Sequence, residues 1–385
     1  MEQNQKLLKS FIAFRKGKSP SFGGVRGGIF MFLFMGCLLF SKAQTVGGLG
    51  VYNFLKLPVS ARNAALGGGL YAVREKDPAL ALMNPSMLNP SLHTGVSINI
   101  VDYFSDAMYG NLNYIHHFQN VGTFNFGFNF ASYGSFDGYD VFGNETGTFS
   151  AGDYALTAGY GREFIDSMFS MGMNVKCIFS KYESYFSAGL GVDLAASYYS
   201  AHHDLALTLL LSNIGAQFNS YAQTREKLPF EIQLSFSQKL KHLPVRYSIL
   251  LQHLQRWNLY NYDPSDPFTP VEGATGKIIP LSAGKKFAEN LFRHVALGLE
   301  ILPIEYLSFQ LSYNYNTRQE MRIYNRRGVA GLAYGVGLHI HHIHLYYARS
   351  HGSMASVPNH FTLSTNIQDL VKNKNSKKKY VKMTE

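Results

Sequence analysis

The sequence predicts an all-β fold: a transmembrane antiparallel β-barrel of about fourteen strands, preceded by a short helical segment. Three observations predict it: long segments of strand-like alternation, an aromatic and glycine-rich composition with few charges, and connections whose lengths alternate. The 385 residues include 25 Tyr, 29 Phe and 36 Gly, and only 16% are charged, against about 25% in an average soluble protein. The mean hydropathy of −0.08 excludes a bundle of membrane helices, which would be apolar on average.

The alternation has period two and continues for longer than soluble strands usually do. Along residues 124–130 every second position is Phe, and the positions between are Asn or Gly. Residues 186–198, 307–315 and 332–340 repeat the pattern, and tilted strands of about 9–11 residues cross a bilayer. A soluble sandwich or propeller is the alternative, but its strands average about 5–6 residues. Its wet face would also carry charges, whereas the polar face here is mostly Ser, Asn, Gly, Gln and Thr.

Fourteen strands can be placed, and their connections sort into two kinds. Connections after even-numbered strands are all short, whereas those after odd-numbered strands include five long ones. Bacterial barrels have short periplasmic turns and long external loops, so the loop lengths agree with the face pattern. The strands are expected at 94–103, 107–118, 121–132, 149–160, 168–180, 184–200, 203–213, 228–239, 244–256, 292–301, 305–316, 329–340, 343–350 and 360–367, and the long connections at 133–148, 214–227, 257–291, 317–328 and 351–359.

Residues 1–43 are expected to form a signal peptide that directs export. The apolar residues 29–40 follow a basic stretch and precede Ser41-Lys42-Ala43, which suits cleavage before Gln44. As a helix this run would span about 18 Å, short of a bilayer core of about 30 Å. Lipidation of Cys37 is disfavoured because the apolar run continues past it. After cleavage only Cys177 remains, so an intrachain disulfide is excluded.

The formal net charge of +10 comes from the two ends of the chain. Residues 1–43 contribute +6 and residues 371–385 contribute +5, which leaves −1 for residues 44–370. A fold that binds nucleic acid through a basic face is therefore not expected. The tail at 368–385 is low in complexity and basic, and we expect a solvated periplasmic segment.

The segment 44–93 lacks alternation and mixes Ala, Leu, Gly and Pro, which indicates short helices and turns. It could lie inside the barrel as a plug or form a periplasmic strap. Its motifs, which contain Arg62, Gly67-Gly68, Asp77 and Asn84-Pro85-Ser86, resemble the N-terminal signature of FadL-like fourteen-stranded barrels. In that group the last motif ends in Ala, so Ser86 departs from the pattern.

Further motifs narrow the resemblance to PorQ-like outer-membrane barrels of the type IX secretion system of Bacteroidetes. They include residues 52–62, Leu228-Pro229-Phe230 and the segment from Arg293-His294 to Glu300. The resemblance implies a non-enzymatic outer-membrane component that anchors a PorZ-like partner in a cell-surface attachment complex with PorU and PorV. A PorV-like shuttle that binds cargo signals is a related alternative. FadL-like transport of hydrophobic small molecules is the other.

No catalytic, cofactor-binding or metal-binding residues are expected. Phosphate-binding and nucleophile-elbow motifs are missing, and Cys177 has only Lys176 as a basic neighbour. The histidines at 116–117, 202–203 and 339–344 cluster near turns. Adjacent strand residues point to opposite faces, so rim side chains are a better interpretation than metal ligands.

The candidate partner-binding residues lie in two long connections, with the outer-membrane lipid as a second expected partner. Exposed Trp and Tyr residues are favoured contact anchors, although packing onto the barrel mouth or into the membrane interface is an equal alternative. For the oxygen-rich first connection, a solvated turn is favoured over a Ca²⁺ site. The candidates are Asp137 and Asp140 in the first long connection, and Trp257, Tyr260, Tyr262 and Phe268 in the longest one.

Overall fold

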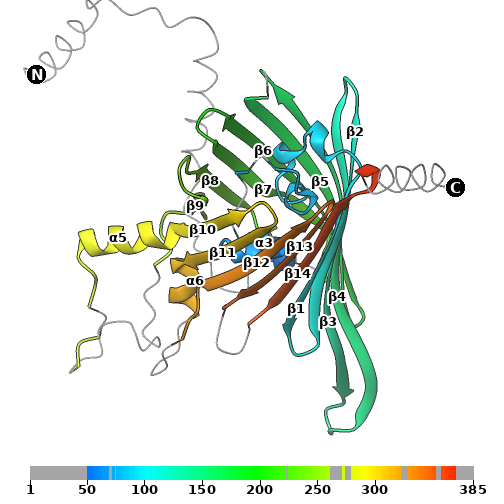
Figure 1. Cartoon of the computed structure of the whole chain (residues 1–385). Coiled ribbons are helices and arrows are strands. Elements are labelled where there is room, and N and C mark those ends of the chain that lie inside the picture. Colours follow the sequence, from blue (N-terminus) through cyan, green and yellow to red (C-terminus); the bar gives the residue numbers. More distant parts are fainter. Residues whose placement is uncertain are drawn as a thin grey trace, which may run out of the picture. The chain divides into compact units, whose positions relative to one another are not determined.

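In the computed structural model, fourteen strands form one closed antiparallel barrel, as predicted (Figure 1). Each strand pairs with its neighbours in the chain, and β1 pairs with β14 to close the sheet. The structure describes residues 50–68, 72–73, 75–165, 167–221, 224–260, 271–273, 279–321, 328–352 and 357–369. The predicted signal peptide, most of the basic tail, Tyr262 and Phe268 therefore lie outside the described residues.

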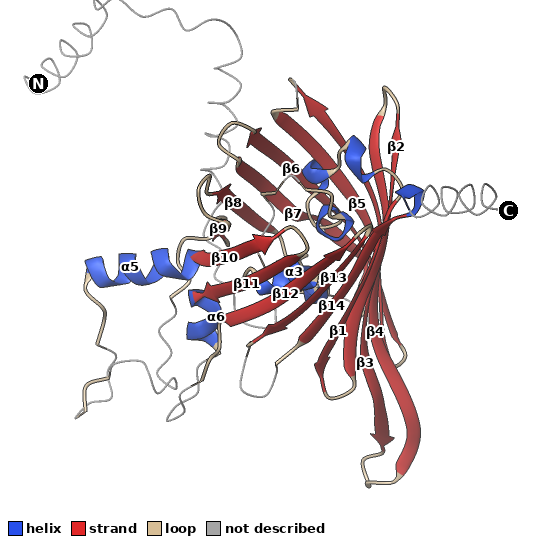
Figure 2. Ribbon diagram, in the orientation of Figure 1, coloured by secondary structure: helices blue, strands red, loops and turns tan. Residues whose placement is uncertain are grey.

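The strands differ in length, from seven residues in β9 to twenty in β4. They are β1 (Gly95–Phe104), β2 (Ala107–Phe118), β3 (Gly122–Tyr139), β4 (Glu145–Phe164), β5 (Phe169–Tyr182), β6 (Tyr185–Ser200), β7 (Leu205–Asn219), β8 (Glu231–Lys239), β9 (Val245–Leu251), β10 (Val295–Ile304), β11 (Leu307–Asn314), β12 (Leu332–Ile340), β13 (Ile343–Ser350) and β14 (Asn359–Asn366). The tall strands are the consecutive set from β3 to β7 (Figure 2).

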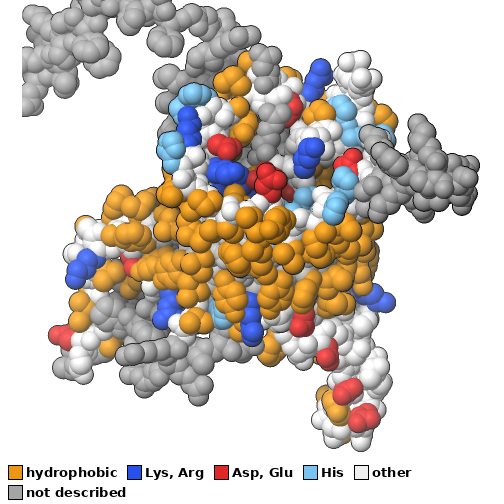
Figure 3. Space-filling model, viewed as in Figure 1, with side chains coloured by type: hydrophobic (Ala, Val, Ile, Leu, Met, Phe, Trp, Pro, Cys, Tyr) orange, Lys and Arg blue, Asp and Glu red, His pale blue; other side chains and the backbone are white. Residues whose placement is uncertain are grey.

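The barrel is apolar outside and polar inside. On β3, Phe126 and Phe128 are exposed, whereas Thr123, Asn125 and Gly127 at the alternate positions are buried and face the lumen. Exposed Leu, Ile, Phe and Tyr side chains from the other strands join them in a continuous apolar belt (Figure 3). Because its side chains are apolar, such a belt faces lipid rather than water. The sheet can span the lipid because closure of the barrel leaves no edge of unpaired backbone groups. The barrel is therefore a transmembrane one.

The two ends of the barrel differ. At the turn end, β1 begins, β14 ends and the even-numbered strands connect through short segments, such as 119–121 and 341–342. At the loop end lie the long connections 220–230, 252–294, 315–331 and 351–358. The predicted alternation of loop lengths is thus present. No helix among the described residues is long and apolar enough to cross a membrane.

The predicted first long connection, 133–148, is instead mostly strand. After register shifts between Ser132 and Ser135 and between Gly138 and Tyr139, β3 and β4 stay paired as far as Tyr139↔Glu145. Only residues 140–144 form the turn. Asp137 therefore lies on β3 and Asp140 in the turn. The prediction was wrong because this hairpin continues past the belt, where polar residues and Gly replace the apolar alternation. The connection predicted at 214–227 is shortened in the same way, because β7 continues to Asn219.

Two helices correct the predicted boundaries of β9, β10 and β11. β9 ends at Leu251, α5 (Ala283–His294) occupies the start of the predicted strand 292–301, and α6 (Tyr315–Glu320) follows β11. Phe287 and Leu291 in α5 are four residues apart, which is helical spacing rather than strand alternation. The Asn314 side chain accepts a hydrogen bond from the Thr317 amide at 3.2 Å and so caps α6.

The described residues among 50–94 (50–68, 72–73 and 75–94) lie inside the barrel and will be called the plug. The plug contains η3 (Asn53–Lys56), α3 (Ala61–Ala65), α4 (Pro78–Ala81), η4 (Pro85–Met87) and η5 (Pro90–Leu92). It starts at the loop end, where Gly50 pairs with Lys227. It finishes at the turn end, where the Thr94 hydroxyl lies 2.9 Å from the Asn366 side chain. The plug therefore runs through the length of the lumen.

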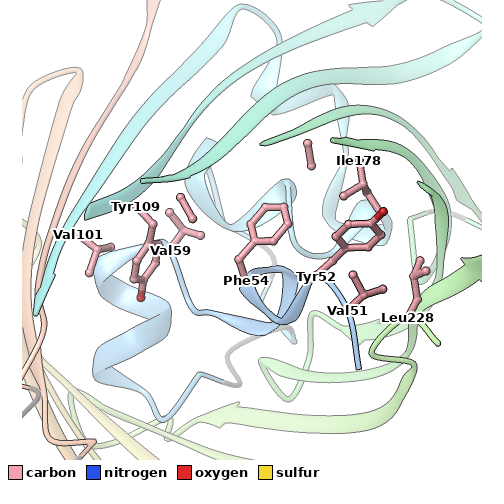
Figure 4. Close-up of a cluster of buried hydrophobic side chains, with 10 residues drawn as sticks. Val51, Tyr52, Phe54, Val59, Val101, Tyr109, Ile178 and Leu228 are labelled. Atoms are coloured by element: carbon pink, nitrogen blue, oxygen red, sulfur yellow. The ribbon is translucent and has the colours of Figure 1, made fainter. Parts of the chain in front are cut away.

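An apolar cluster holds the first part of the plug (Figure 4). Val51, Tyr52, Phe54 and Val59 of the plug pack with side chains of the wall. The Tyr52 hydroxyl also lies 2.6 Å from the Ser187 hydroxyl, so its one polar atom is paired as burial requires. The wall side chains in this cluster are Val101, Tyr109, Ala131, Ala155, Ile178 and Leu228.

Candidate functional site

The plug meets the wall through a group of charges, four of them buried and one, Glu75, half-buried. We call this group the charge latch: Arg62, Glu75, Asp77, Arg246 and Glu300. Arg62 comes from α3, Glu75 and Asp77 from the following plug segment, and Arg246 and Glu300 from β9 and β10. The side chains of Arg62 and Glu300 are each only 1% exposed. Charged side chains are rarely fully buried unless they are paired, so the burial of Arg62 and Glu300 depends on their contacts within the latch.

Small residues allow α3 to come close enough to the wall for this contact. Ala61, Ala64 and Ala65 are buried, and α3 packs on β11, β12, β13 and β14. A Cβ added at Gly335 would lie 2.8 Å from the Cβ of Ala65, which is closer than two such carbon atoms can approach. The Ala61 amide donates to the Thr362 hydroxyl at 2.8 Å, which satisfies a free donor of the first helical turn.

On the wall, three neighbouring strands present the latch partners side by side. Glu300 is in register with Arg246 on β9 and with Gln310 on β11. An Arg246 nitrogen donates to Glu300 Oε2 at 2.8 Å, and the Gln310 amide lies 3.3 Å from Glu300 Oε1. Contacts within the wall therefore orient the Glu300 carboxylate independently of the plug.

Arg62 completes the latch from the plug. Its Nε and Nη2 atoms donate to the two oxygens of Glu300, each at 2.9 Å, the bidentate geometry of the strongest Arg–carboxylate pairs. Its Nη1 atom lies 2.6 Å from Glu75 and 3.5 Å from Asp77. Glu75 also bridges to Arg246 at 2.6 Å. The guanidinium of Arg62 lies 5.7 Å from the centre of the Tyr346 ring, within cation–π range.

The ionisation of the plug carboxyls differs across the latch. Burial opposes the charge on Glu75, but Arg62 and Arg246 outweigh it and lower the pKa of Glu75. Burial raises the pKa of Asp77, and neither Arg62 nor the Ala79 amide fully offsets it. Glu75 therefore keeps its negative charge to a lower pH than an ordinary glutamate does, whereas Asp77 loses its charge at a higher pH than an ordinary aspartate does.

Glycines and capping residues of the motifs shape the rest of the plug. Gly67 and Gly68 have φ values of +80° and +79°, a region that glycine adopts at no steric cost, and they turn the chain out of α3. Asn84 caps η4 by accepting from the Ser86 amide at 3.0 Å. The Ser86 hydroxyl lies 2.6 Å from that of Ser197, so the residue that departs from the family motif binds the wall.

Pro85 packs on a pair of glycines. Gly161 on β4 and Gly172 on β5 are paired in register, and a Cβ on either would overlap the backbone of Pro85. We call Gly161 and Gly172 the glycine seat. It lets the Asn84-Pro85-Ser86 turn lie directly on the sheet, close to the turn end.

A second buried ion pair, between Lys176 and Asp193, lies in the lumen. The Lys176 ammonium is 2.8 Å from Asp193 Oδ2 and 2.9 Å from the Asn213 side chain, and the Asn213 amide donates to Asp193 Oδ1 at 2.9 Å. The pair borders a cavity of about 60 Å³ between plug and wall. A water molecule needs roughly 10–15 Å³ of such space, so this cavity has room for a few waters and is too small for a fatty acid.

The structure brings several of the predicted motif residues together. Arg62 meets Glu300 as described, and Arg293 and His294 meet the predicted partner residues Tyr260 and Trp257. The Arg293 guanidinium lies 5.6 Å from the Tyr260 ring centre, and the His294 and Trp257 rings stack at 5.2 Å. Asp137 and Asp140 lie apart from these residues, on the β3–β4 hairpin.

Sequence reasoning missed Glu75, Arg246, Lys176 and Asp193 as site residues. Arg246, Lys176 and Asp193 each occupy an inward position of a strand, so a charge at a lumen position was the available signal. Among the described residues no group of three or more His, Cys, Asp or Glu could hold a metal ion. His339 and His344, paired on β12 and β13, are 4.9 Å apart between ring centres.

No protein-family model and no curated protein matches the chain. Three similar solved structures are the toluene transporter TodX of Pseudomonas putida (10% identity, 80% of this chain and 98% of that chain, TM-score 0.47), a FadL homologue of Pseudomonas aeruginosa (10%, 81% and 99%, 0.45) and the CymD monoaromatic hydrocarbon channel (10%, 80% and 96%, 0.42). At these identities the similarity is one of fold alone.

Proposed function

We propose that the protein is a non-enzymatic outer-membrane barrel with a closed lumen that anchors a partner at the cell surface. In this proposal the turn end faces the periplasm and the loop end faces outward. The partner would be a PorZ-like protein of a type IX attachment complex that also contains PorU and PorV. The sequence motifs described above suggest this partner.

The closed lumen is the observation that carries the proposal. The described part of the plug reaches from the loop end to the turn end, and the latch ties it to β9 and β10. The cavity beside Lys176 measures about 60 Å³, and a larger one of about 320 Å³ lies at the turn end beside Leu88 and Pro90. A barrel blocked in this way suits a role at its outer surface better than the passage of solutes.

The β3–β4 hairpin is the surface that we assign to the partner. Val141 and Phe142 in its turn are 94% and 87% exposed. Asp140 holds the turn by accepting from the Phe142 and Asn144 amides at 2.8 and 2.9 Å, so these apolar side chains are presented on a fixed support. Aromatic side chains displayed in this way are favoured interface anchors.

Two measurements on purified outer membranes test the proposal. A tag after Glu385 should recover a large surface protein together with the barrel, and Val141→Ser with Phe142→Ser should release that protein. Lys181→Ser, also near the loop end, is the matched control and should retain it. Recovery of the barrel alone from wild-type membranes would overturn the anchor.

FadL-like transport of a hydrophobic molecule is the second candidate. The solved structures reported above include a transporter and a channel. The functions in their names agree with transport better than with a surface anchor, although their similarity to this chain is one of fold alone. An apolar groove of about 360 Å³ on the outer face of β12, β13, β14 and β1 also favours it, because such a groove could hold an acyl chain. Mass spectrometry of lipid extracted from the purified barrel tests it: one ligand bound per barrel would favour transport, and bulk membrane lipid only would not.

A further inference from the structure

From Phe287 to its end at His294, helix α5 has its polar face buried and its apolar face exposed, the reverse of a helix on a water-soluble surface. Asn290 and Arg293 are buried, whereas Phe287, Leu291 and Phe292 are 58%, 40% and 56% exposed. Next to them Trp257 is 49% exposed, with its ring 5.3 Å from that of Phe287. We call these four exposed residues the aromatic shelf.

The buried polar face is fixed by specific bonds. The Asn290 side chain accepts from the amides of Leu259 and Tyr260 at 2.8 and 2.9 Å. Glu289 accepts from Arg293 at 3.1 Å and from the Tyr315 hydroxyl at 2.8 Å. The Arg293 bond lies within the helix, but the Asn290 bonds and the Tyr315 bond hold α5 to its neighbours. The helix therefore cannot rotate its apolar face inward without breaking those bonds to residues outside it.

The shelf is also continuous with the membrane surface of the barrel. α5 runs into β10 without a linker, because His294 is its last residue and Val295 is the first of the strand. Leu297, which is 49% exposed, belongs to the apolar belt, and Phe292 contacts the ring of Tyr315 at 5.9 Å. In Figure 3 the hydrophobic side chains in this region adjoin the belt.

We propose that α5 and Trp257 form an interfacial membrane anchor, with the shelf embedded among the acyl chains of the leaflet at the loop end. The occupant of the shelf is lipid, because the shelf extends the surface that already faces lipid. Trp and other aromatic residues prefer the boundary between acyl chains and headgroups. The proposal requires only that the barrel spans a membrane, and it holds for an anchor and for a transporter alike.

The chain contains one tryptophan, so Trp257 reports on its own surroundings without labelling. The barrel is reconstituted into phosphatidylcholine vesicles whose acyl chains carry bromine either near the headgroup or near the bilayer centre. We expect a clear loss of Trp257 emission with bromine near the headgroup, a smaller loss with bromine at the centre, and little quenching by iodide in the water.

Two control variants calibrate the result, each made together with Trp257→Phe. Leu311→Trp, in the belt on β11, should be quenched by brominated lipid. Phe142→Trp, in the hairpin turn, should be quenched by iodide. If Trp257 behaves like Phe142→Trp, the shelf faces water and the proposal is overturned.

A second pair of variants separates a lipid contact from a structural effect. Phe287→Asp with Leu291→Asp places two charges on the shelf and should transfer Trp257 from lipid quenching to iodide quenching. The heat-dependent shift of the barrel in gel electrophoresis confirms that the variant is folded. A folded double variant whose Trp257 stays quenched by lipid would contradict the assigned position of the shelf.

Discussion

Arg62 and Glu300 are 238 positions apart in the chain and form a bidentate ion pair with two contacts of 2.9 Å. One residue belongs to the plug and the other to the wall, so the pair joins two parts of the fold that no strand pairing connects. Both side chains are buried, and a buried charge that loses its partner is strongly destabilising. The position of the plug therefore depends on this pair.

Arg62→Met should destabilise the folded barrel by about 3–5 kcal/mol, because Glu300 loses its bidentate partner and Arg246 remains as the one cation that contacts both Glu300 and Glu75. Denaturant unfolding in detergent micelles measures the change. Arg349→Met, which changes an exposed arginine on β13, is the control and should have little effect.

A double variant tests whether the loss comes from the uncompensated charge. Arg62→Met with Glu300→Gln removes both charges of the bidentate pair, and such replacements cost less than breaking a pair from one side. We expect the double variant to be more stable than Arg62→Met alone. Equal or lower stability would mean that the latch acts mainly through shape.

Gly172→Ala should displace the Asn84-Pro85-Ser86 turn, because the new Cβ would overlap the backbone of Pro85. Overpacking of this kind costs about 1–3 kcal/mol. Limited proteolysis should then cut the variant within residues 84–94 faster than the wild type. In the matched variant Gly191→Ala the nearest atoms to the new Cβ are 3.5 Å away, an ordinary contact, so unchanged proteolysis is expected there.

Acid should weaken the latch only below the ordinary pKa of a glutamate, 4.5. The pKa of Glu75 is lower in the folded protein than in the unfolded chain. Its contribution to stability is therefore complete above the unfolded value and is lost as the pH falls toward the folded value. The difference in Tm between wild type and Glu75→Gln should stay constant from about pH 7 to 5 and shrink below about 4.5.

The comparison with Glu75→Gln isolates this carboxyl from Asp77, whose pKa is shifted in the opposite direction. Glu305→Gln, in an exposed connection at the turn end, should show a small difference at every pH. If the difference in Tm between wild type and Glu75→Gln is as large at about pH 3 as at about pH 7, the assigned direction of the Glu75 pKa shift is contradicted.

Lys176→Met should lower the free energy of unfolding by about 3–5 kcal/mol, because Asp193 would remain buried without its cation. Lys181→Met on the same strand changes an exposed lysine and should be nearly neutral. The two denaturation curves, measured side by side, give the difference directly. The Asn174 side-chain amide also donates to Asp193 Oδ2, at 3.3 Å. Similar curves for both variants would mean that Asp193 is held well enough by this bond and by the bond from the Asn213 backbone amide.

The strands could be predicted because their signal is local. Phe126, Phe128 and the Asn and Gly residues between them specify which face meets lipid, without reference to any other strand. The β3–β4 hairpin could not, because past the belt both faces meet water and a long strand then resembles a loop. α5 was missed for a related reason: its apolar residues were included in an aromatic-rich connection, and the exposure of its apolar face depends on bonds to residues 258–260.

The charge latch was only half visible in the sequence. Arg62 and Glu300 both stood out in motifs, but their contact depends on how far the plug extends into the lumen. Arg246 joins them through the register between β9 and β10. Register is set by pairing across the whole sheet, so it could not be read from the segment around either residue.

The path of the plug also has a consequence for assembly of the barrel. Gly50 lies at one mouth of the barrel and β1 begins at the other, so the first segment threads the whole pore. Its helix α3 packs on β12, β13 and β14, the last strands to be synthesised, and β14 also closes the sheet against β1. The binding surface of α3 is thus complete only once the final strands are in place, so the sheet closes around a segment of the chain that is synthesised before any strand.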